Sequence, residues 1–165
     1  MMKLYTIALV TLFIGPVRAD GIAPPTMKVQ SKAVDNACTT KGLRQLKDSL
    51  AELKVESSAE AWKAVYTLLC GAINKRNLQY SAQLMLPEVE VSHALMEDET
   101  PVMIESSAIK PNKIFARKYA YGAGFNKQGD ILEVLYDPSE VCTARKTLQY
   151  KNKKWRLSEL MYACE

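Results

Sequence analysis

The C-terminal run, residues 141–164, constrains the fold more than any other stretch of this chain. Two strand-like segments flank the polar residues 151–154, a pattern that predicts a β-hairpin. Cys142 and Cys164 lie at nearly equal distances from that turn. Folding the hairpin would therefore bring the two thiols together, so the sequence predicts a sheet edge and a disulfide that staples it.

The register of this hairpin can be worked out from its turn. A two-residue loop at residues 152–153 aligns three apolar pairs and one pair of opposite charge on one face. These expected pairs are Tyr150 with Trp155, Leu148 with Leu157, Lys146 with Glu159, and Ala144 with Met161. The same register puts Cys142 opposite Ala163, one residue short of Cys164. A β-bulge between the turn and the cysteines would reconcile the two requirements, and so would a three-residue loop.

The N-terminus has the pattern of a secretory signal peptide. Lys3 precedes an apolar run at residues 4–14, and residues 17–19 provide the small side chains that a signal peptidase needs before Asp20. The apolar run is too short to span a bilayer, so cleavage after residue 19 is favoured over a retained anchor. We therefore expect a secreted or periplasmic protein without a stable membrane anchor.

The mature chain is nearly balanced in charge. Of the 22 lysines and arginines, Lys3 and Arg18 fall within the signal peptide, which leaves 20 basic residues against 18 acidic ones. This small excess gives no reason to expect nucleic acid as a partner.

All four cysteines lie in the mature chain, which predicts two disulfides in an exported protein. Zinc is the alternative, but it usually needs closely spaced ligand pairs, and every gap here exceeds about twenty residues. Two antiparallel helices would return Cys70 to the neighbourhood of Cys38. We therefore expect the pairs Cys38–Cys70 and Cys142–Cys164.

The rest of the chain predicts an α+β domain over residues 38–165, after an extended leader at residues 20–37. Leucines at spacings of three and four predict an amphipathic helix from Thr40, and the capping box Ser57 to Glu60 opens a second, more buried helix. Residues 74–77 interrupt the pattern. An apolar segment at 78–86 then ends at Pro87, and residues 88–91 alternate like a short exposed strand.

The remaining strands follow one another closely. The pattern predicts a strand over residues 113–125, a turn at 126–129, a strand at 131–136, a turn at 137–139 and then the closing hairpin. Gly122 and Gly124 indicate a bend or bulge in the first of these strands. The expected architecture is N-terminal helices packed on a C-terminal four-stranded antiparallel meander.

This order of elements resembles the NTF2-like, cone-shaped α+β domains. The resemblance lies in residues 59–62 of the buried helix, residues 84–88 after it, and residues 150–157 in the hairpin. It implies a sheet wrapped round a helix, with room for an apolar pocket. Because that superfamily includes enzymes, carriers and protein-binding modules, the resemblance leaves the function open.

The sequence offers no catalytic set, no cofactor motif and no metal-binding motif. His93 is the single histidine, and without an orienting carboxylate it fits a surface residue better than a general base. The acidic residues 97–99, with Glu88 or Glu90, could hold calcium but lack the spacing of a calcium loop. A solvated acidic loop is the simpler interpretation.

Two groups of residues are candidates for binding. The aromatic set Tyr119, Tyr121, Tyr136, Tyr150 and Trp155 could line a pocket, although core packing is the simpler interpretation. The basic set Lys151, Lys153, Lys154 and Arg156 could dock into an acidic cleft on a partner, although a solvated turn explains it too.

The function predicted from these features is an exported, disulfide-stabilised, non-enzymatic protein-binding module. In a bacterium this would be a periplasmic inhibitor or immunity protein. The alternatives are an NTF2-like carrier that binds a small apolar ligand among the aromatic set, and an NTF2-like enzyme that uses His93.

Overall fold

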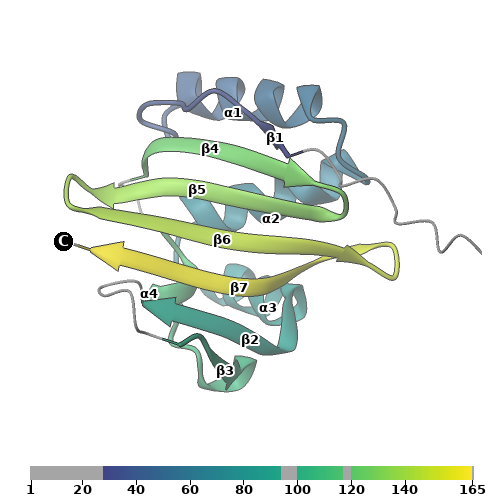
Figure 1. Ribbon diagram of the computed structural model, residues 1–165, viewed down its shortest axis with the longest axis vertical. Helices are drawn as coiled ribbons and strands as arrows, with labels where there is room; N and C mark the ends of the chain where they lie inside the picture. The colour runs from purple at the N-terminus through teal and green to yellow at the C-terminus, as the bar shows by residue number, and fades with distance from the viewer. Residues whose placement is uncertain (1–27, 94–99, 117–119, 165) are drawn as a thin grey trace, which may run out of the picture.

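The computed structural model describes residues 28–93, 100–116 and 120–164, so the predicted signal peptide lies outside the described residues. Within these ranges the chain forms helices that cover one face of a mixed sheet (Figure 1). The helices are α1 (Thr40–Glu52), α2 (Ser58–Cys70), α3 (Lys75–Leu84) and α4 (Pro111–Ile114), with a 3₁₀ turn, η1 (Ser106–Ala108). The strands are β1 (Val29–Gln30), β2 (Met85–His93), β3 (Val102–Glu105), β4 (Tyr121–Gln128), β5 (Ile131–Ser139), β6 (Cys142–Lys151) and β7 (Lys154–Cys164).

The sheet is larger than the predicted meander. Its order is β1-β4-β5-β6-β7-β2-β3, so the four antiparallel strands β4 to β7 form its centre. β2 adds to β7 in parallel, and β3 pairs with β2 in antiparallel orientation. The prediction of an exposed strand at residues 88–91 is wrong about exposure, because β2 lies between two strands and buries Val89 and Val91. The α+β class is confirmed, and the four-stranded, all-antiparallel sheet is not.

The two long helices follow the predicted leucine pattern. Leu46 and Leu50 of α1 are buried, and the Thr39 side chain caps the helix by accepting from the Gly42 N–H at 3.1 Å. Helix α2 buries more of its surface, as expected from its broad apolar face. The Cys38–Cys70 disulfide joins the start of α1 to the end of α2, which confirms this pairing.

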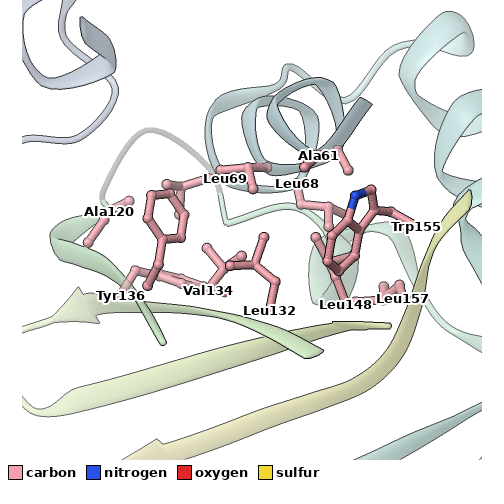
Figure 2. Close-up of a cluster of buried hydrophobic side chains, with 14 of the residues drawn as sticks. Ala61, Leu68, Leu69, Ala120, Leu132, Val134, Tyr136, Leu148, Trp155 and Leu157 are labelled. Carbon is pink, nitrogen blue, oxygen red and sulfur yellow. The ribbon is translucent and has the colours of Figure 1, made fainter. Parts of the chain in front are cut away.

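The core lies between α2 and the inner face of the sheet. Figure 2 shows the side chains of β5, β6 and β7 facing those of α2. Burying these large apolar side chains stabilises the fold by about 1.5–3 kcal/mol each relative to exposure. The residues labelled in this cluster are Ala61, Leu68, Leu69, Ala120, Leu132, Val134, Tyr136, Leu148, Trp155 and Leu157.

The leader prediction needs a correction. Residues 28–34 are extended and residues 35–38 form a turn, but they belong to the domain: β1 pairs with β4, and Val34 bridges Ala123. Val34 and Ala37 are buried. These two apolar side chains account for the docking of the segment onto the sheet.

The predicted capping box does not form. Ser57 has the left-handed φ of 46°, and its side chain makes no capping hydrogen bond. The Ser57 hydroxyl lies 3.1 Å from the Tyr150 hydroxyl instead, so a contact with the distant hairpin replaces the local one. The predicted interruption at residues 74–77 is shorter in the structure: Asn74 caps α3 by accepting from the Asn77 N–H at 2.9 Å, and residues 75–77 already belong to that helix.

Three boundaries in the meander also differ from the prediction. The expected strand at 113–125 starts too early, because Pro111 opens the short helix α4. The first turn is at Gly129 and Asp130 rather than 126–129, and Gly129 has the positive φ of 56° that glycine favours. The second turn follows Ser139, because β5 continues through an irregularity that accommodates Pro138. The expected bulge at Gly122 is confirmed by a register shift there.

Among the described residues, we find no helix with the length and apolar character needed to cross a membrane.

Candidate functional site

The β6–β7 hairpin is the candidate functional site, and its tip is a tight turn. Lys151 pairs with Lys154, and the two residues between them, Asn152 and Lys153, have φ values of 52° and 60°. Two positive φ values in a two-residue loop are the mark of a type I′ turn, whose twist matches that of the flanking strands. The turn extends past the neighbouring strands of the sheet (Figure 1).

The hairpin contains the bulge that the cysteine positions require. Tyr150 faces Trp155 and Leu148 faces Leu157, as predicted, but the register then shifts at Ser158. The Ser158 hydroxyl donates to the Thr147 carbonyl oxygen at 3.1 Å. Cys142 is therefore opposite Cys164, and the two form the second expected disulfide.

The same bulge overturns two predicted pairs. Lys146 faces Leu160 rather than Glu159, and Ala144 faces Tyr162 rather than Met161. One extra residue moves the rest of β7 to the opposite face relative to β6. Glu159 consequently lies on the outer face of the sheet, where it pairs with Arg145.

The part of the hairpin next to the turn is anchored to the helical layer. Trp155 Nε1 donates to the Glu56 carbonyl oxygen at 2.7 Å, and the Tyr150 hydroxyl contacts Ser57. Arg156 donates to the Gln83 carbonyl oxygen. This oxygen is in the last turn of α3, where carbonyl groups have no intrahelical hydrogen-bond donor. These contacts fix the direction in which the turn projects.

The tip itself carries positive charge that no described acidic residue pairs with. Lys151, Lys153 and Lys154 are exposed, and none forms an ion pair with a described residue. Of the predicted basic set, Arg156 is set apart from these three because it is half-buried against α3. The structure thus divides the set into an exposed tip and an anchored guanidinium.

A cleft lies beside the hairpin, between β7 and the helices α2 and α3. Its volume is about 410 Å³, and it is lined by Glu60, Tyr80, Gln83, Leu84, Lys154, Trp155 and Arg156. The Tyr80 hydroxyl is buried and has no hydrogen-bond partner among the described residues. Burial raises the pKa of Tyr80, and the Glu60 carboxylate raises this pKa further while Arg156 lowers it.

The predicted aromatic set is not gathered in one place. Tyr136 and Trp155 are core residues, Tyr121 is exposed, and Tyr119 lies outside the described residues. Tyr150 is half-buried beside Trp155, with the ring centroids 5.2 Å apart. Within this set, only Tyr150 and Trp155 therefore form an aromatic contact, and they lie next to the turn of the hairpin.

His93 lies at the end of β2, with its ring centroid 6.3 Å from that of Tyr162. The acidic residues 97–99 lie outside the described residues, so their part in a calcium site stays untested. In the described ranges, we find no group of at least three histidine, cysteine, aspartate or glutamate side chains that could hold a metal ion.

A buried lysine is the functional group that the sequence reasoning missed. Lys146 is completely buried, with Nζ 5.0 Å from the Tyr136 ring centroid and within 3.5 Å of the Tyr162 hydroxyl and the Lys113 carbonyl oxygen. Burial lowers the pKa of Lys146 to about 7. The alternation of Ala144, Lys146 and Leu148 along β6 already places all three on one face, which is the signal that could have revealed it.

Comparison with known proteins finds no family model, no curated protein and no solved structure that matches this chain. The resemblance to NTF2-like domains therefore stays a prediction.

Proposed function

We propose that this chain is an exported protein-binding module that inserts the tip of its β6–β7 hairpin into an acidic cleft on a partner protein. Within a bacterium the partner would be a toxin or a cell-wall enzyme, and this chain its periplasmic inhibitor or immunity protein. The observation that carries the proposal is the tip itself: three exposed lysines without ion-pair partners in the described structure, on a rigid hairpin.

The tip is poorly suited to stability, which supports a role in binding. Lys151 lies directly opposite Lys154, and like charges at such a position repel each other. Lys153 occupies a left-handed position where glycine is strongly preferred, at a cost of about 1 kcal/mol. A turn such as Asn-Gly would relieve this strain, so the lysines are better explained by an acidic partner.

The scaffold behind the tip favours tight binding. The Cys142–Cys164 disulfide closes one end of the hairpin, and the Trp155 and Tyr150 contacts hold the other. A hairpin that is already ordered loses less conformational entropy when it docks, so more of the interaction energy contributes to affinity.

The two disulfides also support export. Such bonds persist mainly in oxidising compartments, as expected for a secreted or periplasmic protein.

Site-specific photo-crosslinking in the native host tests the proposal. A photoreactive amino acid would replace Asn152 at the tip in one protein and Asp48, exposed on α1, in a matched control. We expect a single predominant partner protein to crosslink at position 152 and not at position 48, and an excess of unlabelled protein to suppress it. Equal crosslinking at both positions, or none at position 152, would contradict the proposal.

A further inference from the structure

The cleft beside the hairpin contains a hydrogen-bond donor that the described structure leaves unused. The Tyr80 hydroxyl is shielded from solvent, yet no acceptor lies within reach among the described residues. A buried hydroxyl without a hydrogen-bond partner is energetically unfavourable, so such groups usually have one. The half-buried Tyr80 side chain also lines a cleft of about 410 Å³. An acceptor group from another molecule has room to enter this cleft, and it reaches the hydroxyl when the Tyr80 ring turns toward it.

The charges that line the cleft indicate which acceptor this would be. Arg156 uses Nη1 to hold the Gln83 carbonyl oxygen, and its other N–H groups make no hydrogen bond within the described structure. Lys154 provides a second positive charge at the cleft, and Lys63 a third nearby, with Nζ 4.4 Å from the Tyr80 ring centroid. Glu60 is the single acidic residue in the lining. An anionic acceptor is favoured by this excess of positive charge.

We propose that the cleft binds the carboxylate of an aspartate or glutamate side chain on the partner protein, with Tyr80 and Arg156 as its hydrogen-bond donors. This inference rests on the proposed function, because it assigns a second contact to the acidic surface that the hairpin tip engages. A carboxylate has two oxygens, which matches a phenol and a guanidinium as donors. Lys154 belongs both to the tip and to the lining, so the two contacts are adjacent.

Glu60 has a defined place in this arrangement. After burial, its negative charge is the next largest cause of the raised pKa of Tyr80, whose phenol is in any case a protonated donor at neutral pH. The same charge repels an incoming carboxylate. Replacing it by the neutral glutamine should therefore strengthen the binding of an acid and weaken the binding of a cation, which gives the test a definite sign.

The experiment is an NMR titration that uses the two tryptophans as reporters. Trp155 is one of the residues that line the cleft, and its indole packs in the core directly behind it, so its N–H resonance reports on the cleft. Trp62 lines a separate hollow between α1 and α2 and serves as an internal control. The probe is a capped hexapeptide of alternating glutamate and glycine, added to millimolar concentration to the mature, disulfide-bonded protein. The matched control peptide has glutamine in place of glutamate.

We expect the acidic peptide to shift the Trp155 indole N–H resonance while that of Trp62 stays in place, and the glutamine peptide to shift neither. Tyr80→Phe should weaken binding about tenfold, since it removes a hydrogen bond to a charged group. The free Tyr80→Phe protein should nevertheless be at least as resistant to urea as the original, because the variant removes an unsatisfied hydroxyl. Glu60→Gln should tighten binding a few-fold.

Three results would overturn the inference. Shifts confined to the backbone of Lys151 and Lys153 would leave the hairpin function standing and exclude the cleft. A peptide that shifts no resonance would exclude the cleft, and the hairpin proposal would then be decided separately by crosslinking at position 152. Weaker binding of the acidic peptide by Glu60→Gln would show that Glu60 does not repel the bound carboxylate, and so that the carboxylate does not lie beside Tyr80 and Arg156.

Discussion

Replacing the buried Lys146 by methionine should stabilise the protein. Met is similar in length and apolar, so it can fill the space beside Tyr136, Val134 and Leu160 without bringing a charge. Lys146 has no carboxylate partner among the described residues. The groups that face it are Tyr136 of β5, Tyr162 of β7 and the Lys113 carbonyl of α4, with Lys113 Nζ and His93 close to Tyr162.

The size of the effect follows from the pKa of Lys146, which burial lowers from 10.5 to about 7. Below pH 7 both the folded and the unfolded chain are protonated at this amine, and the folded state bears the full cost of the buried charge. A pKa difference of about 3.5 corresponds to at most about 5 kcal/mol. Between pH 7 and 10.5 the unfolded state binds more protons than the folded one, so this cost falls as pH rises, to about 1.5 kcal/mol at pH 9.5.

Urea unfolding of both proteins at pH 5.5 and pH 9.5 measures this difference. Burial raises the pKa values of Tyr136 and Tyr162. Their ionisation lowers the stability of the protein only above about pH 10, so it does not affect the comparison at either pH. We expect the advantage of Lys146→Met in free energy of unfolding to be about 3 kcal/mol larger at pH 5.5 than at pH 9.5. An advantage that does not change with pH, or a loss of stability at pH 5.5, would refute the assignment of Lys146 as a buried, unpaired amine.

Three further predictions concern the hairpin. Lys153→Gly should raise the free energy of unfolding by about 0.5–1 kcal/mol in thermal denaturation, because glycine favours the left-handed turn; a loss of stability would contradict the type I′ geometry. Replacing Cys142 and Cys164 by serine should lower the free energy of unfolding, measured in urea, by about 3 kcal/mol, given their sequence separation of 22. An unchanged free energy of unfolding would mean that this disulfide does not stabilise the fold. Trp155→Phe should cost about 1–3 kcal/mol, since it leaves a gap in the core and the Glu56 carbonyl oxygen unpaired, whereas an unchanged midpoint would show that this anchor contributes little.

Local patterns in the sequence predict the elements whose partners are close along the chain. The leucine spacing predicts α1, and the polar residues 151–154 predict the hairpin turn. The two disulfide pairs follow because helix and strand hairpins bring their cysteines together by simple reversal of the chain.

The features that sequence reasoning missed depend on contacts between distant residues. β2 and β7 pair in parallel, and parallel strands are not joined by a tight turn, so the local sequence contains no turn signal that would predict this pairing. The position of the bulge at Ser158 decides that Leu160, and not Glu159, lies opposite Lys146, and the local sequence gives no strong sign of such a one-residue shift in register. Glu60, Tyr80 and Arg156 come from three separate elements, so their convergence in the cleft required the packed structure.

The role of the hairpin tip can be measured as the affinity of this protein for the partner that crosslinks at position 152. Isothermal titration would compare the original protein with Lys151→Glu/Lys153→Glu/Lys154→Glu and with Lys41→Glu/Arg44→Glu/Lys47→Glu. The second variant reverses the same number of charges on the exposed face of α1. We predict that the tip variant binds about 100-fold more weakly or worse, because three like charges would face an acidic cleft, and that the α1 variant binds within a few-fold of the original. Equal weakening by both variants would show that the affinity depends on net charge alone and not on the position of the charges. Unchanged affinity of the tip variant would show that the hairpin tip does not bind the partner.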